Sequence, residues 1–99
     1  MLDSKADDFT VELLPKTLRP GALLTVKVDS VEPADEVYVH CRELGWLRQV
    51  LSTEDGIHWT VRLHVQSDMT KGDYQVLVVV RDRAGNRAEQ KHTLTVEAK

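Results

Sequence analysis

The clearest fold signal lies in residues 71–86, KGDYQVLVVVRDRAGN. From Tyr74 to Val80, the residues of one parity are all apolar, as expected of a β-strand with one face in a core. Gly85 and Asn86 follow this strand, and both residue types tolerate the positive φ that a tight turn requires. Residues 71–86 therefore predict a strand that ends in a hairpin turn.

The same two-residue period occurs in segments 24–29, 59–65 and 93–97, with shorter candidates at 10–14 and 37–41. Turn signals rich in Gly, Pro and Asp separate these segments at the spacing of a sandwich. We therefore predict an all-β antiparallel sandwich of about seven strands. Its expected inward residues on the three longer segments are Leu24, Val26, Val28, Trp59, Val61, Leu63, Val65, Leu94 and Val96.

Residues 43–51 fit neither period cleanly. Leu44, Leu47 and Leu51 have the spacing of a helical stripe, but Gly45 interrupts the segment. We expect an irregular edge strand here, with a short helix as the alternative.

Length and composition restrict the class of protein. The chain has 99 residues and a net charge of −3, and a hydrophobic content of 41% is enough for one globular core. Nucleic-acid binding needs a basic face, so we expect no nucleic-acid partner. No apolar run approaches the roughly 20 residues that cross a bilayer, so we expect no membrane insertion. A single cysteine excludes an internal disulfide.

The two ends of the sequence suggest a module. Residues 1–8 are polar and acidic and predict a solvated linker, and residues 9–97 predict a single domain. Residues 1–8 lack the apolar run of a signal peptide. Because the strand pattern reaches almost to both ends, we expect a module that belongs to a longer chain.

Segments 71–76 and 80–86 together resemble the end of bacterial immunoglobulin-like and fibronectin type III-like domains. The resemblance implies that Tyr74 forms a tyrosine corner, with its hydroxyl bonded to backbone a few residues upstream. It also implies that Asp82, Gly85 and Asn86 form the last hairpin turn, with the Asp82 carboxylate bonded to turn amides. The lone Cys41 departs from the disulfide-linked members of this superfamily.

No catalytic, cofactor or metal site is expected. Cys41 has the parity of inward residues, where a thiol behaves as a small hydrophobe, and His40 beside it points to the opposite face. The chain has no His-x-His or Cys-x-x-Cys pattern that would suggest zinc. Asp82, Asn86 and Asp35 carry oxygen ligands that suit calcium, but the Asp-x-x-Gly-Asn pattern is first a turn.

Two surface features suggest binding. Tyr38, Leu77 and Val79 are expected on one outward face, where they would form an apolar contact patch or merely pack across strands. Trp46 and Tyr38 are the candidates for a sugar-stacking platform, whereas Trp59 shares the register of the core.

These features predict a non-catalytic module of a larger secreted or cell-surface protein, located outside the cell. It would act as a spacer and as a contact unit for neighbouring domains or another protein. The alternatives are a carbohydrate-binding module with a polysaccharide partner, or an accessory domain packed on a catalytic domain of the same chain.

Overall fold

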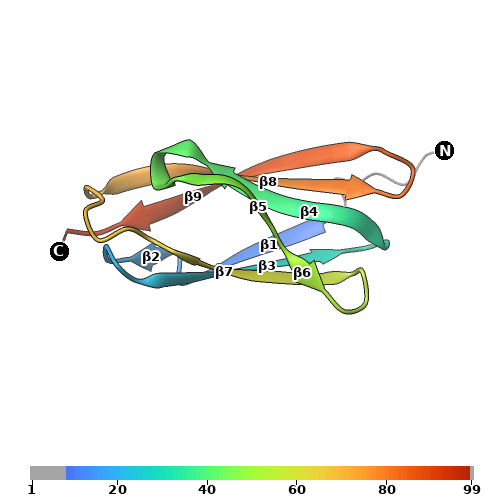
Figure 1. Cartoon of the computed structure of the whole chain (residues 1–99), viewed down its shortest axis with the longest axis horizontal. Coiled ribbons are helices and arrows are strands. Elements are labelled where there is room, and N and C mark those ends of the chain that lie inside the picture. Colours follow the sequence, from blue (N-terminus) through green and yellow to red (C-terminus); the bar gives the residue numbers. More distant parts are fainter. Residues whose placement is uncertain (1–8, 99) are drawn as a thin grey trace.

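The computed structural model describes residues 9–98, which form two β-sheets packed face to face (Figure 1). The linker expected over residues 1–8 lies outside the described residues. One sheet has the strand order β1-β3-β7-β6, and the other has the order β2-β9-β8-β4-β5. The elements are β1 (Phe9–Leu14), β2 (Thr17–Leu18), β3 (Leu23–Ser30), β4 (Ala34–Cys41), the 3₁₀ helix η1 (Arg42–Leu44), β5 (Trp46–Val50), β6 (Ser52–Thr53), β7 (His58–His64), β8 (Gly72–Asp82) and β9 (Arg87–Val96).

The fold confirms the predicted all-β sandwich without a disulfide. Adjacent strands pair antiparallel, except that the two-residue strand β2 runs parallel to β9. Strands β2 and β6 are too short to give a periodic signal. They are the two described strands that the sequence pattern did not predict.

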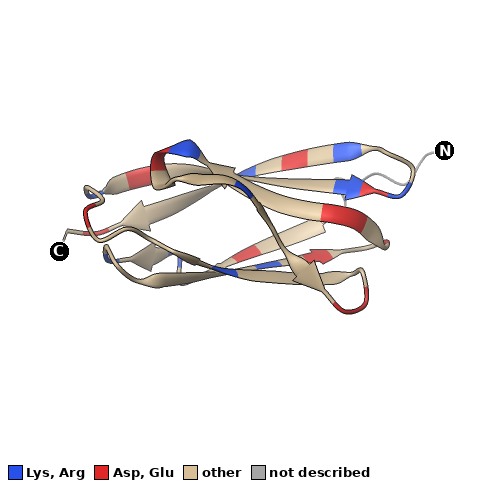
Figure 2. Ribbon diagram, in the orientation of Figure 1, with Lys and Arg blue, Asp and Glu red and all other residues tan. Residues whose placement is uncertain are grey.

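The core lies between the two sheets and consists mainly of valine and leucine. Branched side chains suit this position because they pack well on a pleated surface. No charged side chain of residues 9–98 is buried, and the charged residues spread over strands and turns (Figure 2). Side chains with at most 1% exposure include Leu24, Val26, Val28, Val37, Val39, Val65, Val76, Val78, Val80, Leu94 and Val96.

The segment 43–51 contains both structures that its sequence suggested. Residues Arg42–Leu44 form a single turn of 3₁₀ helix, which ends at Gly45 with φ 78°. The chain then continues as β5, an edge strand beside β4. Leu44 and Leu51 are buried, whereas Leu47 is 61% exposed, so the helical leucine stripe does not persist.

The described chain begins with β1 in one half of the sandwich and ends at the far end of the other half (Figure 1). The principal extents are 48 × 24 × 19 Å. Strand β1 begins at the end that carries the turns 31–33, 54–57 and 83–86, which we call the N-terminal pole. Strand β9 ends at the other, the C-terminal pole, near the turns 19–22 and 66–71. Among residues 9–98 there is no helix with the length and hydropathy of a membrane span.

Trp59 anchors the core beneath the N-terminal pole. Its side chain is 6% exposed, as its register predicts, and its Nε1 donates to the carbonyl oxygen of Gly56 at 3.0 Å. The indole therefore packs against the core and also ties the turn before β7 to the strand. Loss of this side chain would remove both contributions.

We predict that Trp59→Ala lowers the free energy of unfolding by about 3–5 kcal/mol, the usual cost of truncating a buried aromatic side chain. Denaturant titration followed by circular dichroism measures this loss. Trp59→Phe should lose less and should still fold. Leu47→Ala, at an exposed position, is the control and should change stability by no more than about 0.5 kcal/mol. An equally small effect of Trp59→Ala would contradict this role in the core.

Candidate functional site

Tyr74 lies at the start of β8 and connects that strand to the preceding loop. Its ring packs against the core, and its Oη donates to the carbonyl oxygen of Thr70 at 2.7 Å. This is the backbone contact of a tyrosine corner. The residue therefore has a structural part in the fold, and its hydroxyl is engaged rather than available to a ligand.

The turn between β8 and β9 is organised by the carboxylate of Asp82. Its Oδ1 accepts from the backbone N–H groups of Ala84 and Asn86, both at 2.9 Å, and Oδ2 accepts from Asn86 Nδ2 at 3.2 Å. Gly85 has φ 89°, a conformation in which glycine avoids the steric cost of a side chain. Burial acts to raise the pKa of Asp82, but hydrogen bonds from Asn86, Ala84 and Gly85 outweigh it and lower this pKa.

Both oxygens of Asp82 are thus occupied by donors of its own turn, which leaves them poorly placed to bind calcium. Among residues 9–98 no group of three or more His, Cys, Asp or Glu side chains could hold a metal ion. The arrangement fits the turn interpretation of the Asp-x-x-Gly-Asn pattern.

The expected contact patch lies on the outer face of the five-stranded sheet. Tyr38 and Leu77 are partly buried there, and Tyr38 pairs across strands with Val79. Val79 is only 1% exposed although it points away from the main core. Of the two expectations for this residue, the structure agrees with packing across strands, and Val79 adds no accessible surface to the patch.

Arg48 covers much of the remaining patch. Its guanidinium carbon lies 4.9 Å from the centroid of the Tyr38 ring, within cation–π range. Its Nη2 also donates to both carboxylate oxygens of Glu36 at 2.6 Å, and this bond lowers the pKa of Glu36. Arg48 has φ 99°, and the pairing of β4 with β5 shifts register between Val39 and Cys41. The irregular edge strand thus places a cation over the tyrosine.

The sugar-platform prediction for Trp46 is wrong. Its side chain is 5% exposed, and its Nε1 donates to the carbonyl oxygen of His64 at 3.4 Å. Trp46 therefore closes the side of the sandwich between β5 and β7. The Tyr38 ring is covered by Arg48, so the two candidate rings do not form an exposed stacking surface.

Cys41 lacks the environment of a catalytic thiol. It is 1% exposed, and its Sγ lies 3.7 Å from Glu43 Oε1. Burial is the main cause that raises the pKa of Cys41, and the nearby Glu43 carboxylate raises it further. A nucleophilic cysteine requires the opposite shift and access to a substrate.

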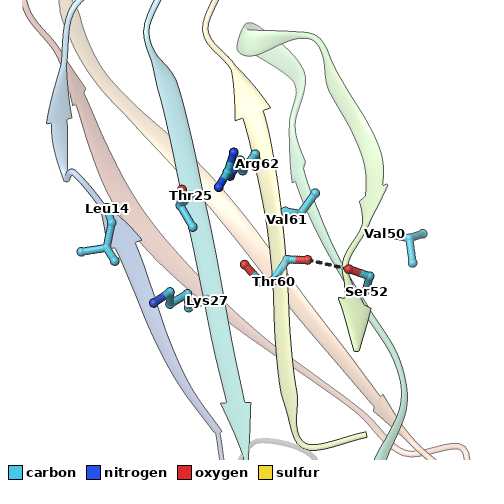
Figure 3. A pocket seen from close by; sticks show the side chains of 8 residues that line it. All are labelled: Leu14, Thr25, Lys27, Val50, Ser52, Thr60, Val61 and Arg62. Atoms are coloured by element: carbon cyan, nitrogen blue, oxygen red, sulfur yellow. Dashed lines mark hydrogen bonds between the residues drawn. The ribbon is translucent and has the colours of Figure 1, made fainter. Parts of the chain in front are cut away.

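A shallow groove crosses the outer face of the four-stranded sheet (Figure 3). Its volume is about 620 Å³, and it is lined by Leu14, Thr25, Lys27, Val50, Ser52, Thr60, Val61 and Arg62. The Thr and Ser hydroxyls of the lining, together with Lys27 and Arg62, can donate hydrogen bonds to a polar ligand. The lining contains no carboxylate, thiol or imidazole for acid–base chemistry. The outward parity of Lys27 and Arg62 was readable from the sequence. The positions of Val50 and Ser52 in this groove could not be predicted from the sequence, because both residues lie where the chain crosses from β5 in one sheet to β6 in the other.

The lowered pKa of Asp82 predicts a pH-dependent part of the stability. This contribution is complete above the unfolded-state pKa of about 3.9, and it is lost as the pH falls through the lower folded-state value. Asp82→Asn should therefore lower the thermal midpoint at pH 7, and the difference from the unmodified chain should shrink on acidification to about pH 2. An unchanged difference at both pH values would contradict the role of the charged carboxylate.

Cys41 should be unreactive in the folded chain. We expect a chromogenic disulfide reagent to modify less than about one tenth of the thiol in native conditions within the time that modifies the urea-unfolded chain fully. Absorbance of the released thiolate measures both reactions. Equal rates in the two conditions would contradict this prediction, because they would show that the Cys41 thiol is accessible in the folded chain, as a reactive thiol must be.

The comparison with protein families agrees with this geometry. The family model described as a bacterial Ig-like domain matches residues 23–98, which include β3 through β9. No curated protein shows significant similarity to the chain. The matched region contains every described strand of the two sheets except β1 and β2, together with the Tyr74 corner and the Asp82 turn, and it covers most of the sequence. The chain therefore belongs to the family of bacterial Ig-like domains.

Proposed function

We propose that this chain is a non-catalytic spacer module of a larger secreted or cell-surface protein, where it separates and contacts neighbouring domains. The observation that supports this proposal most strongly is the position of the chain ends in opposite halves of a body 48 Å long. Domains attached to the two ends would be held on opposite sides of the sandwich. Membership of the bacterial Ig-like family is consistent with a non-catalytic role.

The strands next to the two ends favour a load-bearing spacer. Strand β2 follows β1 along the chain, and it pairs with β9 parallel through Thr17–Thr95 and Leu18–Val96. Backbone N–H groups of Thr95 and Glu97 donate to the carbonyl oxygens of Lys16 and Leu18 at 3.0 and 2.8 Å.

Tension on this pairing acts along the strands. A pull on the N-terminal side draws β2 towards the N-terminal pole, and a pull on the C-terminal side draws β9 the other way. Because the two strands are parallel, tension makes them slide past each other and loads their hydrogen bonds together. A hairpin pulled open from one end would instead lose its bonds one at a time.

The contacts with neighbours would lie mainly at the poles. At the N-terminal pole, the β6–β7 turn of the four-stranded sheet carries Glu54 and Asp55, and the β8–β9 turn of the five-stranded sheet carries Arg83. The turn that joins β3 to β4 carries Glu32. This division offers both signs of charge to an adjoining domain. The outer face of the five-stranded sheet, where Arg48 lies over Tyr38, would provide a second contact through Leu77 and the exposed Val50 on β5.

Removal of one β2–β9 hydrogen bond tests the mechanical part of this proposal. Thr95→Pro deletes the N–H that donates to Lys16, so we expect a lower unfolding force in single-molecule pulling through the chain ends. Thr93→Pro is a matched control, because β2 pairs with β9 only at Thr95 and Val96 and not at residue 93. Each of the two threonines also makes one side-chain hydrogen bond to β8.

The proposal predicts that Thr95→Pro reduces the force while Thr93→Pro leaves it near that of the unmodified chain. Equal forces for all three chains would contradict the load-bearing role of the β2–β9 pairing. Thermal melting of each variant shows whether a force change merely follows a change in stability.

A further inference from the structure

The first seven residues of β9 have a sheet partner on one side only. Strand β8 pairs with β9 along ten residues, from Arg81–Arg87 to Gly72–Val96. On the opposite side, β2 pairs only with Thr95 and Val96. Residues 87–93 therefore form an open sheet edge within the described part of the chain.

The direction of the backbone groups along this edge follows from the bonds of β9. The N–H groups of Thr95 and Glu97 point towards β2. Since successive residues of a strand alternate in direction, the N–H and C=O groups of residues 87, 89, 91 and 93 point to the same open side. A groove of about 480 Å³ lies beside the end of this edge and is lined in part by Val11, His92 and Thr93. No described strand fills this side of β9 beyond β2.

An exposed edge of this length pairs readily with another strand. The charges on β9 indicate which strand fits. Basic and acidic positions alternate along it, as Figure 2 shows, in the order Arg87, Glu89 and Lys91. These three side chains are exposed and share the outer face of the sheet.

We propose that the open edge of β9 binds the same edge of a second copy of this chain, in an antiparallel pair centred on Gln90. In this register Glu89 lies opposite Lys91 of the second copy, and Lys91 lies opposite its Glu89. Arg87 lies opposite the neutral Thr93. Opposite charges directly across two strands stabilise their pairing, whereas like charges destabilise it.

The alternative registers are less suitable. A pair centred on residue 89 places two glutamates opposite each other and sets Arg87 against Lys91. A pair centred on residue 91 opposes two lysines, and one centred on 92 extends into the positions that β2 already occupies. A pair centred on 88 extends into the turn 83–86. The register on Gln90 uses all seven open residues.

The proposed dimer has a defined geometry. Residues 87, 89, 91 and 93 of each copy exchange about eight backbone hydrogen bonds, and the two five-stranded sheets become one. The two-fold axis is perpendicular to the sheet, so the long axes of the two copies run in opposite directions. The interface is small, so the association belongs to the weak and transient class.

Variants in which the charges at positions 89 and 91 are reversed test this register. Sedimentation equilibrium from about 10 µM to about 1 mM, a range suited to weak interfaces, should detect dimers of the unmodified chain. Glu89→Lys and Lys91→Glu should each weaken self-association by about tenfold, because each sets like charges opposite each other twice. The double variant should recover the dimer.

A mixture of the two single variants provides the most specific measurement. Glu89→Lys carries two lysines and Lys91→Glu carries two glutamates at these positions, so the two variants should form a heterodimer with each other more readily than either forms a homodimer. Glu54→Lys and Lys71→Glu are controls for net charge, since both positions are exposed and lie in turns away from residues 87–93. Thermal melting should show all variants folded.

A monomer at every concentration, together with no heterodimer in the mixture, would overturn the proposal. A dimer that resists both single charge changes would also overturn it. If Leu77→Lys dissociated such a dimer, the contact would belong to the outer face of the five-stranded sheet.

Discussion

Strand β9 is paired on one side along all ten residues and on the other along only two. This unequal pairing results from the path of the chain, which leaves the four-stranded sheet after β1 and joins the five-stranded sheet as β2. The short parallel contact joins β2, which follows the first strand, to β9, the last strand. A pull on the two chain ends would draw these two strands in opposite directions. On the side away from β8, the short contact leaves residues 87–93 without a partner among the described strands. The proposed spacer role and the proposed self-association therefore depend on the same feature.

The sequence was sufficient to predict the strands with one face in the core. Leu24, Val26 and Val28 alternate with polar residues because burial selects one parity of a strand, and the structure places all three in the core. The resemblance to bacterial immunoglobulin-like domains implied the roles of Asp82 and Tyr74, and both hold because their bonds involve residues no more than four positions apart. Motifs of this kind depend on local spacing rather than on the arrangement of distant strands.

The candidate site was less predictable because it depends on neighbours that are distant in the sequence. Alternation predicted that Val79 points outward, but it could not decide between an accessible contact and packing across strands. Trp46 follows the left-handed Gly45 and precedes Arg48 with positive φ, so strand parity gives no reliable direction for its side chain. Strand β2 has two residues, too few for any periodic signal. The open edge of β9 could be recognised only once the pairing on both sides was known.

Amide hydrogen exchange along β9, measured by NMR at low concentration, tests the unequal pairing most directly. If β9 is paired unequally, exchange is slow at Thr95 and Glu97, which donate to β2, and at the even-numbered residues whose N–H groups face β8. Exchange should be fast at Glu89, Lys91 and Thr93, whose N–H groups face the open side. Slow exchange at these three residues in the monomer would contradict the unequal pairing, because it would show that another part of the chain already covers the edge.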